Sequence, residues 1–467
     1  MSIDRVGRRV RRRIAPADGQ SAESGITRRE LLKRGVGATV LVAAPDLLSS
    51  TSALGAPGNA AAGFFFLFGI ADPATASSLE AGRPPAPGEA GLSPIATELA
   101  ALPVTSPNGT KLALVTVEDH GAAAVVKMRI VDKQSAAAVS TGTLTLPRSP
   151  DALILVTPTF AADSATLCLV LSITVPTARG TGTKLNPNTG EIVTVPTTTW
   201  VSHHALAYFN SDQHRVTGPF DLADAPSLAR VNVGATANDL FLWTLAEPAA
   251  TPGPTPETQL AVFPLESGKP RLTVPAPGAW PVNEEPTVSL SNGKVARLVY
   301  SEQIELYSSK DGSRTSLTIA PFAEGSTKPA PATMQLRPDG RVFLSKPAIG
   351  KAVIVDPLDS FRVVSSVAFP PPELASGGPS GKAALAADGK TVYVLGSAQD
   401  GGISAYDASS GTLVASHADG LQYAGLYALP SGALVAVKDS SPRLSFFDSS
   451  LNAIGVADTN LHVVEVF

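Results

Sequence analysis

The amino-acid sequence predicts an all-β fold, a seven-bladed β-propeller that follows an N-terminal signal peptide. Three observations predict this fold. A pattern of turns and strands recurs at intervals of 43 to 49 residues, the chain holds 40 glycines and 40 prolines among 467 residues, and 44% of the residues are hydrophobic while only 16% are charged. Such periods are typical of propellers, because each repeat is a small sheet that buries its faces only against neighbouring copies.

The repeat is clearest in the C-terminal third of the chain. There the turn Asp388-Gly389 precedes the apolar run 391–395, and a second apolar run, 402–407, ends in aspartate. Asp-Gly and Asn-Gly pairs suit hairpin turns because glycine readily adopts positive φ angles. The repeat glycines, spaced by 47, 49 and 43 residues, are Gly293, Gly340, Gly389 and Gly432.

These spacings divide the chain into blades within a propeller domain of residues 63–467. The expected blades are 97–147, 148–198, 199–277, 278–323, 324–373, 374–420 and 421–467. The units between 148 and 277 are less regular, so six or eight blades remain open. A ring of sheets is best closed without an open edge. We therefore expect either 461–467 or 64–70 to complete a sheet begun at the other end of the chain.

The copies resemble the YVTN-type propeller repeat, in which a Pro-Asp-Gly-Lys turn precedes Val-Tyr-Val and a later strand ends in aspartate. The match is good over 330–450, fair near 290 and 106, and poor from 150 to 275. The Trp-Asp ending of WD40 repeats is absent. The resemblance implies a fold, and one fold can carry unrelated functions.

Near the N-terminus, the segment Thr-Arg-Arg-Glu-Leu-Leu-Lys at 27–33 resembles the twin-arginine export motif, whose pattern is Ser/Thr-Arg-Arg-x-Phe-Leu-Lys. It departs from that pattern only by a leucine at the usual phenylalanine position. The resemblance implies that the twin-arginine export machinery is a partner, since this route reads the arginine pair as an address. The residues that carry the signal are Arg28, Arg29, Leu31, Leu32 and Lys33.

Residues 1–62 as a whole are expected to be this signal peptide and a small-residue linker. The apolar stretch 35–44 is too short for a transmembrane helix, which needs about 20 apolar residues. No stable membrane span is therefore expected, and the location is expected to be secreted, periplasmic or in the cell envelope. Small residues allow cleavage after Ala53, Gly55 or Ala62, and the sequence leaves open which site is used and whether cleavage occurs.

Charge and cysteine content narrow the range of partners. The first 34 residues hold ten Arg and Lys against four Asp and Glu, and no basic run follows Arg34. The remaining acidic body argues against nucleic acid, whose binding needs a basic face. We expect a monomer. The single cysteine, Cys168, lies in an apolar run and is expected to be a buried strand residue that acts as a small hydrophobe.

Candidate binding residues come from a general property of propellers, whose ligands usually bind at one end of the central channel. Residues that precede each expected innermost strand would converge at this channel mouth and could form a polar pocket. They are His203, His204, Trp280, Glu284, Glu285, Lys382, Gln422 and Tyr423.

The sequence contains no phosphate cradle, nucleophile elbow or paired cysteine ligands, so no catalytic residue, metal ligand or cofactor is predicted. The favoured function is a scaffold that binds a small ligand or a protein at the channel mouth. One alternative is a lactonase-like hydrolase, because some YVTN-like propellers resemble lactone hydrolases, and it would use His203 with Glu284 and Glu285. Another is a redox propeller with an organic cofactor, although the docking motifs of such proteins are absent. Whether the chain is an enzyme stays open.

Overall fold

The computed structural model describes 21 segments of the chain, and for some of them, among them 65–70, 77–82, 96–99, 176–185, 192–200 and 462–466, it describes the backbone. The described segments are 65–70, 77–82, 96–99, 102–149, 152–185, 192–222, 228–246, 258–276, 287–290, 292–299, 303–323, 333–337, 339–346, 349–370, 383–386, 388–396, 402–421, 423–429, 431–438, 443–459 and 462–466. Strands in these segments form eight four-stranded antiparallel sheets. The leader, with Arg28, Arg29, Leu31, Leu32 and Lys33, lies outside the described residues.

Seven of the sheets each use four strands that are consecutive in the chain, and the first four of these sheets cover the less regular half of the sequence. The β4–β7 sheet contains β4 (Leu102–Thr105), β5 (Lys111–Asp119), β6 (Ala123–Asp132) and β7 (Ala138–Pro147). The β8–β11 sheet contains β8 (Leu153–Phe160), β9 (Thr166–Leu185), β10 (Ile192–Asn210) and β11 (Arg215–Asp221). The β12–β15 sheet contains β12 (Leu228–Ala235), β13 (Asp239–Ala246), β14 (Thr258–Pro264) and β15 (Leu272–Pro275). The β16–β19 sheet contains β16 (Thr287–Ser289), β17 (Lys294–Val299), β18 (Gln303–Ser308) and β19 (Arg314–Thr318), followed by the short helix α2 (Ala320–Ala323).

The other three sheets of consecutive strands follow the clear repeat. The β20–β23 sheet contains β20 (Thr333–Leu336), β21 (Val342–Lys346), β22 (Lys351–Asp356) and β23 (Arg362–Ala368). The β24–β27 sheet contains β24 (Ala383–Leu385), β25 (Thr391–Leu395), β26 (Ile403–Asp407) and β27 (Leu413–His417). The β28–β31 sheet contains β28 (Tyr423–Ala428), β29 (Leu434–Lys438), β30 (Arg443–Phe447) and β31 (Ala453–Asp458).

The eighth sheet joins the two ends of the chain. It contains β1 (Phe65–Ile70), β2 (Ser77–Gly82), β3 (Ala96–Leu99) and the last strand, β32 (His462–Val466), in the order β3-β2-β1-β32. β32 pairs antiparallel with β1, with Leu67 opposite Val466 and Ile70 opposite His462. The expectation that a terminal strand completes a sheet begun at the other end is thereby confirmed.

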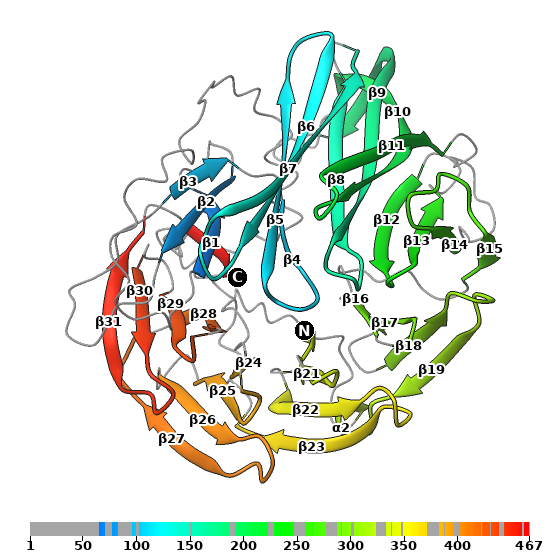
Figure 1. Cartoon of the computed structure of the whole chain (residues 1–467). Helices are drawn as coiled ribbons and strands as arrows, with labels where there is room; N and C mark the ends of the chain where they lie inside the picture. The colour runs from blue at the N-terminus through cyan, green and yellow to red at the C-terminus, as the bar shows by residue number, and fades with distance from the viewer. Residues whose placement is uncertain are drawn as a thin grey trace, which may run out of the picture.

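The sheets are arranged around a central axis, as Figure 1 shows. The first strands of successive sheets contact one another. Examples are the pairs β4 and β8, β12 and β16, and β24 and β28. In the seven sheets of consecutive strands, the first strand is therefore the innermost. This confirms the all-β propeller, with seven sheets of consecutive strands and an eighth that closes the ring. The expected blade boundary between residues 198 and 199 lies inside β10, and the first blade expected at 97 is preceded by the closing sheet.

Among the residues whose side chains the structure describes, apolar side chains fill the space between neighbouring sheets, and the β8–β11 sheet buries both of its faces. Met128 of the β4–β7 sheet and Phe209 of the β8–β11 sheet belong to one buried cluster. On the opposite face of the β8–β11 sheet, Cys168 and Tyr208 pack with Leu240 of the next sheet. Burial raises the pKa of the Cys168 thiol far above its ordinary value, which fits the expected apolar role.

The glycines of the sequence repeat occupy the turns that the repeat predicts. Their φ angles are +75° at Gly293, +79° at Gly340, +71° at Gly389 and +86° at Gly432. Each lies between the first and second strands of its sheet. These angles are in the left-handed region, which side chains with a Cβ rarely adopt, so glycine is the residue that fits there.

The propeller has two different faces. Turns between first and second strands, and between third and fourth strands, lie on one face, here called the turn face, because consecutive strands run antiparallel. Connections between second and third strands, and those that lead to the next sheet, lie on the other, here called the connection face. Several connections there are longer than the turns, such as the 11 residues between Pro275 and Thr287. Binding and catalytic residues are often found on loops that a rigid scaffold holds in place. The loops of the connection face are therefore the first place to look for a functional site.

Candidate functional site

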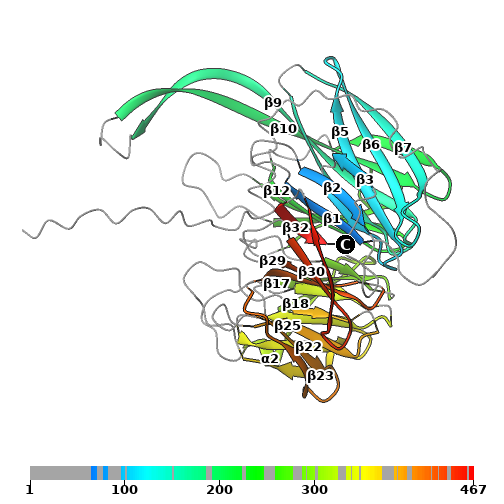
Figure 2. The ribbon, with the colours of Figure 1, turned by 90° about the vertical axis from the view of Figure 1, so that its left-hand side faces the viewer.

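A long hairpin projects from the connection face. β9 has 20 residues and β10 has 19, whereas the longest strands of the other sheets have 10. β8 pairs with β9 only as far as Thr174, and β11 pairs with β10 only from Ala205 onward. Residues 175–185 and 192–201 continue as a two-stranded ribbon, here called the arm, which stands clear of the ring in Figure 2.

His203 and His204 lie at the root of the arm, and the structure does not bring them to one site. Adjacent residues of a strand face opposite sides. His203 is exposed, while His204 is 5% exposed and its Nδ1 lies 3.0 Å from the Ser172 hydroxyl oxygen. The sequence placed both histidines directly before an innermost strand. They lie instead in the third strand of their sheet, because that sheet begins earlier in the chain, at β8.

The environment of His204 favours the neutral imidazole. Burial, and secondarily the nearby His203, lowers the pKa of His204 below its ordinary value. Its Nε2 is buried and has no hydrogen-bond partner among the residues that the structure describes. A proton added to Nε2 would therefore place an unpaired charge at the root of the arm.

Tyr423, which the sequence placed directly before an innermost strand, is the first residue of the innermost strand β28 and belongs to a polar cluster on the connection face. Its hydroxyl donates to Asp419 Oδ2 at 2.5 Å. Nε2 of His417, the last residue of β27, lies 3.4 Å from the same oxygen. The backbone N–H of Leu421 donates to the other carboxylate oxygen at 2.9 Å. We call His417, Asp419 and Tyr423 the Tyr423 cluster.

The electrostatics of the Tyr423 cluster follow from this sharing of one carboxylate. Burial, together with the hydrogen bond to Asp419, raises the pKa of Tyr423. Burial alone would raise the pKa of Asp419 as well, but the hydrogen bonds from Tyr423 and Leu421 and the nearby His417 hold it below its ordinary value. The carboxylate therefore stays ionised and orients the imidazole.

Aromatic packing fixes the cluster in place. The ring of Phe447 meets the His417 ring edge-on at a centroid distance of 4.8 Å and the Tyr423 ring at 6.3 Å. About a quarter of the side chains of His417 and Asp419 stays exposed. The cluster can thus offer a partly exposed imidazole and carboxylate to a polar ligand beside an innermost strand.

The other predicted binding residues lie outside the described residues. They are Trp280, Glu284, Glu285, Lys382 and Gln422. Of the three described ones, Tyr423 lies in the β28–β31 sheet and the two histidines lie in the β8–β11 sheet, so the described geometry does not join them. Sequence reasoning missed His417 and Asp419, although the pair Asp419-Gly420 directly before Tyr423 marks a turn.

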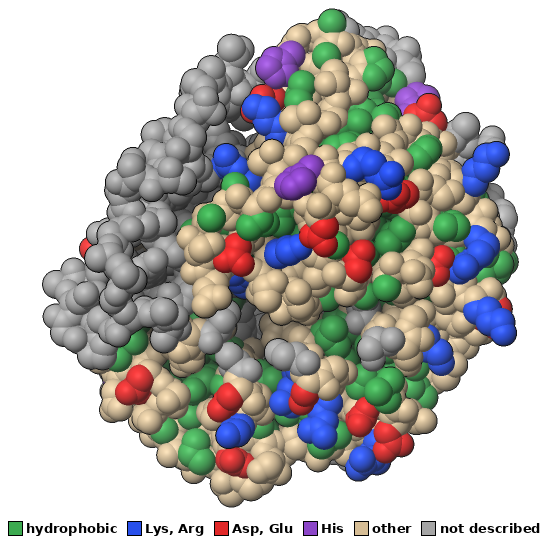
Figure 3. All heavy atoms as spheres, viewed as in Figure 1, with side chains coloured by type: hydrophobic (Ala, Val, Ile, Leu, Met, Phe, Trp, Pro, Cys, Tyr) green, Lys and Arg blue, Asp and Glu red, His purple; other side chains and the backbone are tan. Residues whose placement is uncertain are grey.

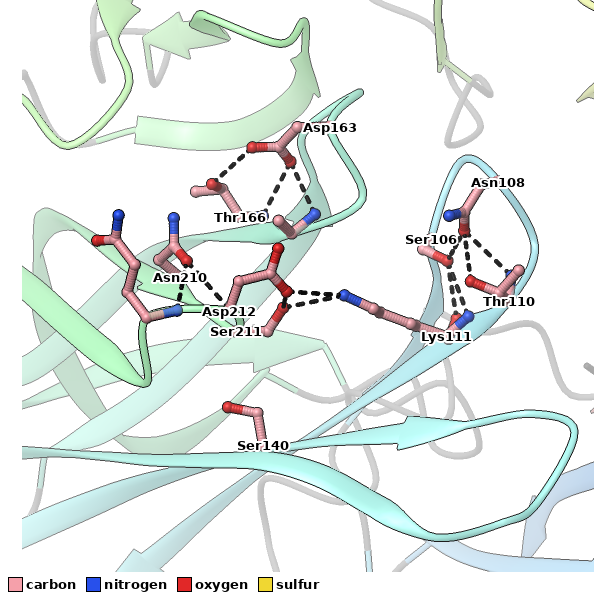
Figure 4. A network of polar contacts seen from close by, with 12 residues as sticks. Ser106, Asn108, Thr110, Lys111, Ser140, Asp163, Thr166, Asn210, Ser211 and Asp212 are labelled. Carbon is pink, nitrogen blue, oxygen red and sulfur yellow. Dashed lines mark hydrogen bonds and ion pairs between the residues drawn. The ribbon is translucent and has the colours of Figure 1, made fainter.

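The turn face carries a polar network that ties the arm-bearing sheet to its neighbour (Figure 4). Lys111 Nζ donates to Asp212 Oδ1 at 3.2 Å, and the backbone N–H of Asn108 donates to the Ser164 hydroxyl at 3.2 Å. These bonds join the β4–β5 turn with the β8–β9 and β10–β11 turns. We assign this network a structural role, because its members satisfy one another within short turns.

The view of Figure 3 shows basic and acidic side chains interspersed over the described surface, with the histidines apart from one another. Within the described segments, no group of three or more His, Cys, Asp or Glu side chains is arranged to hold a metal ion. Over the same part of the chain, no helix has the length and apolar character needed to cross a membrane.

No protein-family model matches the chain, and no curated protein matches it by sequence. Among solved structures, apo AztD from Citrobacter koseri is similar over 87% of this chain and 97% of its own, with 11% identity and a TM-score of 0.47. A putative 6-phosphogluconolactonase from Bacteroides uniformis is similar over 87% of this chain and 99% of its own, with 12% identity and a TM-score of 0.40. Saccharomyces cerevisiae Sqt1 is similar over 78% and 86%, with 10% identity and a TM-score of 0.42. Such distant likenesses carry no argument about function.

Proposed function

We propose that this chain is an exported β-propeller that binds a ligand or protein partner on its connection face and acts as a binding scaffold. The observation that carries the proposal is the difference between the two faces. Short turns and a satisfied polar network occupy the turn face, whereas the connection face bears the arm and the partly exposed Tyr423 cluster. No described geometry favours the hydrolase alternative.

The twin-arginine motif supports the export part of the proposal. Replacing both Arg28 and Arg29 by lysine keeps the charge of the leader and removes the arginine pair. We expect the variant to remain in the cytoplasm, as detected by fractionation of the producing cells. Export at the wild-type level would refute the route.

Photo-crosslinking tests the binding part of the proposal. A photoreactive amino acid would replace His203, which is exposed at the root of the arm, in one variant of the full-length chain, and Leu421 beside the Tyr423 cluster in another. The matched control is Leu358, which is 68% exposed in a turn-face loop. In the producing cells we expect crosslinked species from the first two positions and none from the third. Adducts formed at Leu358 alone would place the binding surface on the turn face and contradict the proposal.

A further inference from the structure

The arm is a two-stranded ribbon over about ten residues of each strand. Among the described residues, 175–185 of β9 pair with β10 alone, and 192–201 of β10 pair with β9 alone. Two-stranded ribbons are marginally stable in water, and their unpaired backbone groups are ready to accept another strand. The arm therefore presents two outer edges that a further strand could extend.

The two outer edges differ in their capacity to pair. β10 carries Pro196 in the middle of the arm, while 177–185 of β9 hold no proline. Proline has no N–H to donate, so within a sheet it is placed where its nitrogen faces away from the paired strand. Pro196 thus removes a donor from the outer edge of β10. Residues directly opposite in an antiparallel pair either exchange two hydrogen bonds or none, so Thr181, opposite Pro196, has its backbone N–H and C=O on the outer edge of β9.

We propose that the open edge of β9 pairs with the same edge of a second copy of this chain, antiparallel and centred on Thr181. In this register Arg179 lies opposite Thr183 of the second copy, and Lys184 lies opposite Ala178. Arg179 and Lys184, both basic, are the charged residues of 177–185. In this register neither is placed opposite another basic residue. Nine paired residues extend roughly 30 Å, and a threonine pair at the centre is favourable across strands.

Two features select a second copy as the occupant. The edge stands away from the ring, so its partner must also be an extended strand that stands clear of its own body, as the arm does in Figure 2. Pairing then forms a four-stranded sheet in the order β10-β9-β9-β10, with Pro196 on both outer edges. The blocked edges end the assembly at a two-fold dimer rather than an open fibre. The sequence alone predicts a monomer, and the arm is the reason to replace that expectation. The inference does not depend on the proposed function.

Sedimentation velocity of the full-length chain, over a range of protein concentrations, tests this pairing with two matched variants. Thr181→Pro removes the donor at the centre of the open edge. Thr198→Pro makes the same change on the edge of β10 that Pro196 already interrupts. We expect the wild type and Thr198→Pro to dimerise and the dissociation constant of Thr181→Pro to rise at least tenfold. Disulfide trapping gives a second readout, since Thr181→Cys should form a covalent dimer on oxidation while Thr194→Cys on β10 should not.

The outcomes separate clearly. A wild type that sediments as a monomer at all concentrations overturns the proposal, as does a dimer that Thr181→Pro leaves intact. If Thr181→Pro fails to fold, as judged by its thermal transition, the cysteine pair decides: equal crosslinking of both cysteine variants, or of neither, refutes pairing through the β9 edge.

Discussion

Tyr423 and Asp419 share a hydrogen bond of 2.5 Å that spans the connection between an outermost strand, β27, and the innermost strand of the next sheet, β28. The same carboxylate accepts the backbone N–H of Leu421 and faces His417. The Asp419 carboxylate thereby contacts the last residue of β27, the backbone of the connection and the first residue of β28. This arrangement makes the Tyr423 cluster a rigid feature of the connection face.

Tyr423→Phe is expected to remove this hydrogen bond and lower the free energy of unfolding by about 1.5–3 kcal/mol, the usual range for a hydrogen bond to a charged group. Asp419 has a lowered folded-state pKa against a reference of 3.8, so its contribution is present above about pH 4 and is lost as the pH falls through the folded-state pKa. Urea unfolding at pH 7 and pH 3 measures both effects. The difference between wild type and variant should shrink at pH 3, and an unchanged difference would contradict the role of the Asp419 carboxylate.

The propeller fold could be predicted because its turns are specified by adjacent residues. Which distant strands pair with one another could not be predicted in this way. Asp388-Gly389 specifies a hairpin from two adjacent residues, so the pattern survives in the bare sequence. The residues next to His203 do not indicate that its strand, β10, is the third strand of a sheet and pairs with β9. The expected blade boundary therefore fell inside β10. The repeat indicates that Tyr423 lies close to the start of an innermost strand, but the carboxylate that it shares with His417 depends on how β27 ends.

His204 is expected to make the protein less stable in mild acid. Its folded-state pKa lies below the reference of 6.5, so the unfolded chain takes up a proton that the folded chain resists. The free energy of unfolding should therefore fall as the pH drops below about 6.5, and should be unaffected by this group above that value. His204→Asn keeps a polar partner for Ser172 and does not titrate. Urea unfolding at pH 8.0 and pH 5.5 should show a larger loss for the wild type, and equal losses would exclude His204 as the cause.

The closing strand is expected to control the stability of the whole ring. Deletion of residues 462–467 removes the strand that joins the two ends of the chain and leaves one edge of β1 without its partner. Exposed strand edges promote association between chains, so the deletion should lower the thermal midpoint and increase light scattering on heating. Removal of residue 467 alone, beyond the last residue of β32, is the control and should change neither. A full deletion that melts and scatters like the wild type would show that the ring does not need β32.

Substitutions at Gly402 and Gly432 can distinguish the conformational cost of a side chain at a positive φ angle from the cost of a steric clash. Both have positive φ angles, +95° and +86°. A Cβ at Gly432 would meet no atom within 4 Å, whereas a Cβ at Gly402 would clash with the backbone oxygen of His417. Gly432→Ala should therefore cost only the conformational penalty, about 1–2 kcal/mol. Gly402→Ala should cost more, because the clash also displaces His417 from Asp419. Chemical denaturation measures both free energies, and the His417 ring resonances in NMR spectra should shift for Gly402→Ala alone. Equal costs, with an unshifted His417, would contradict the close packing of Gly402 against the backbone of His417.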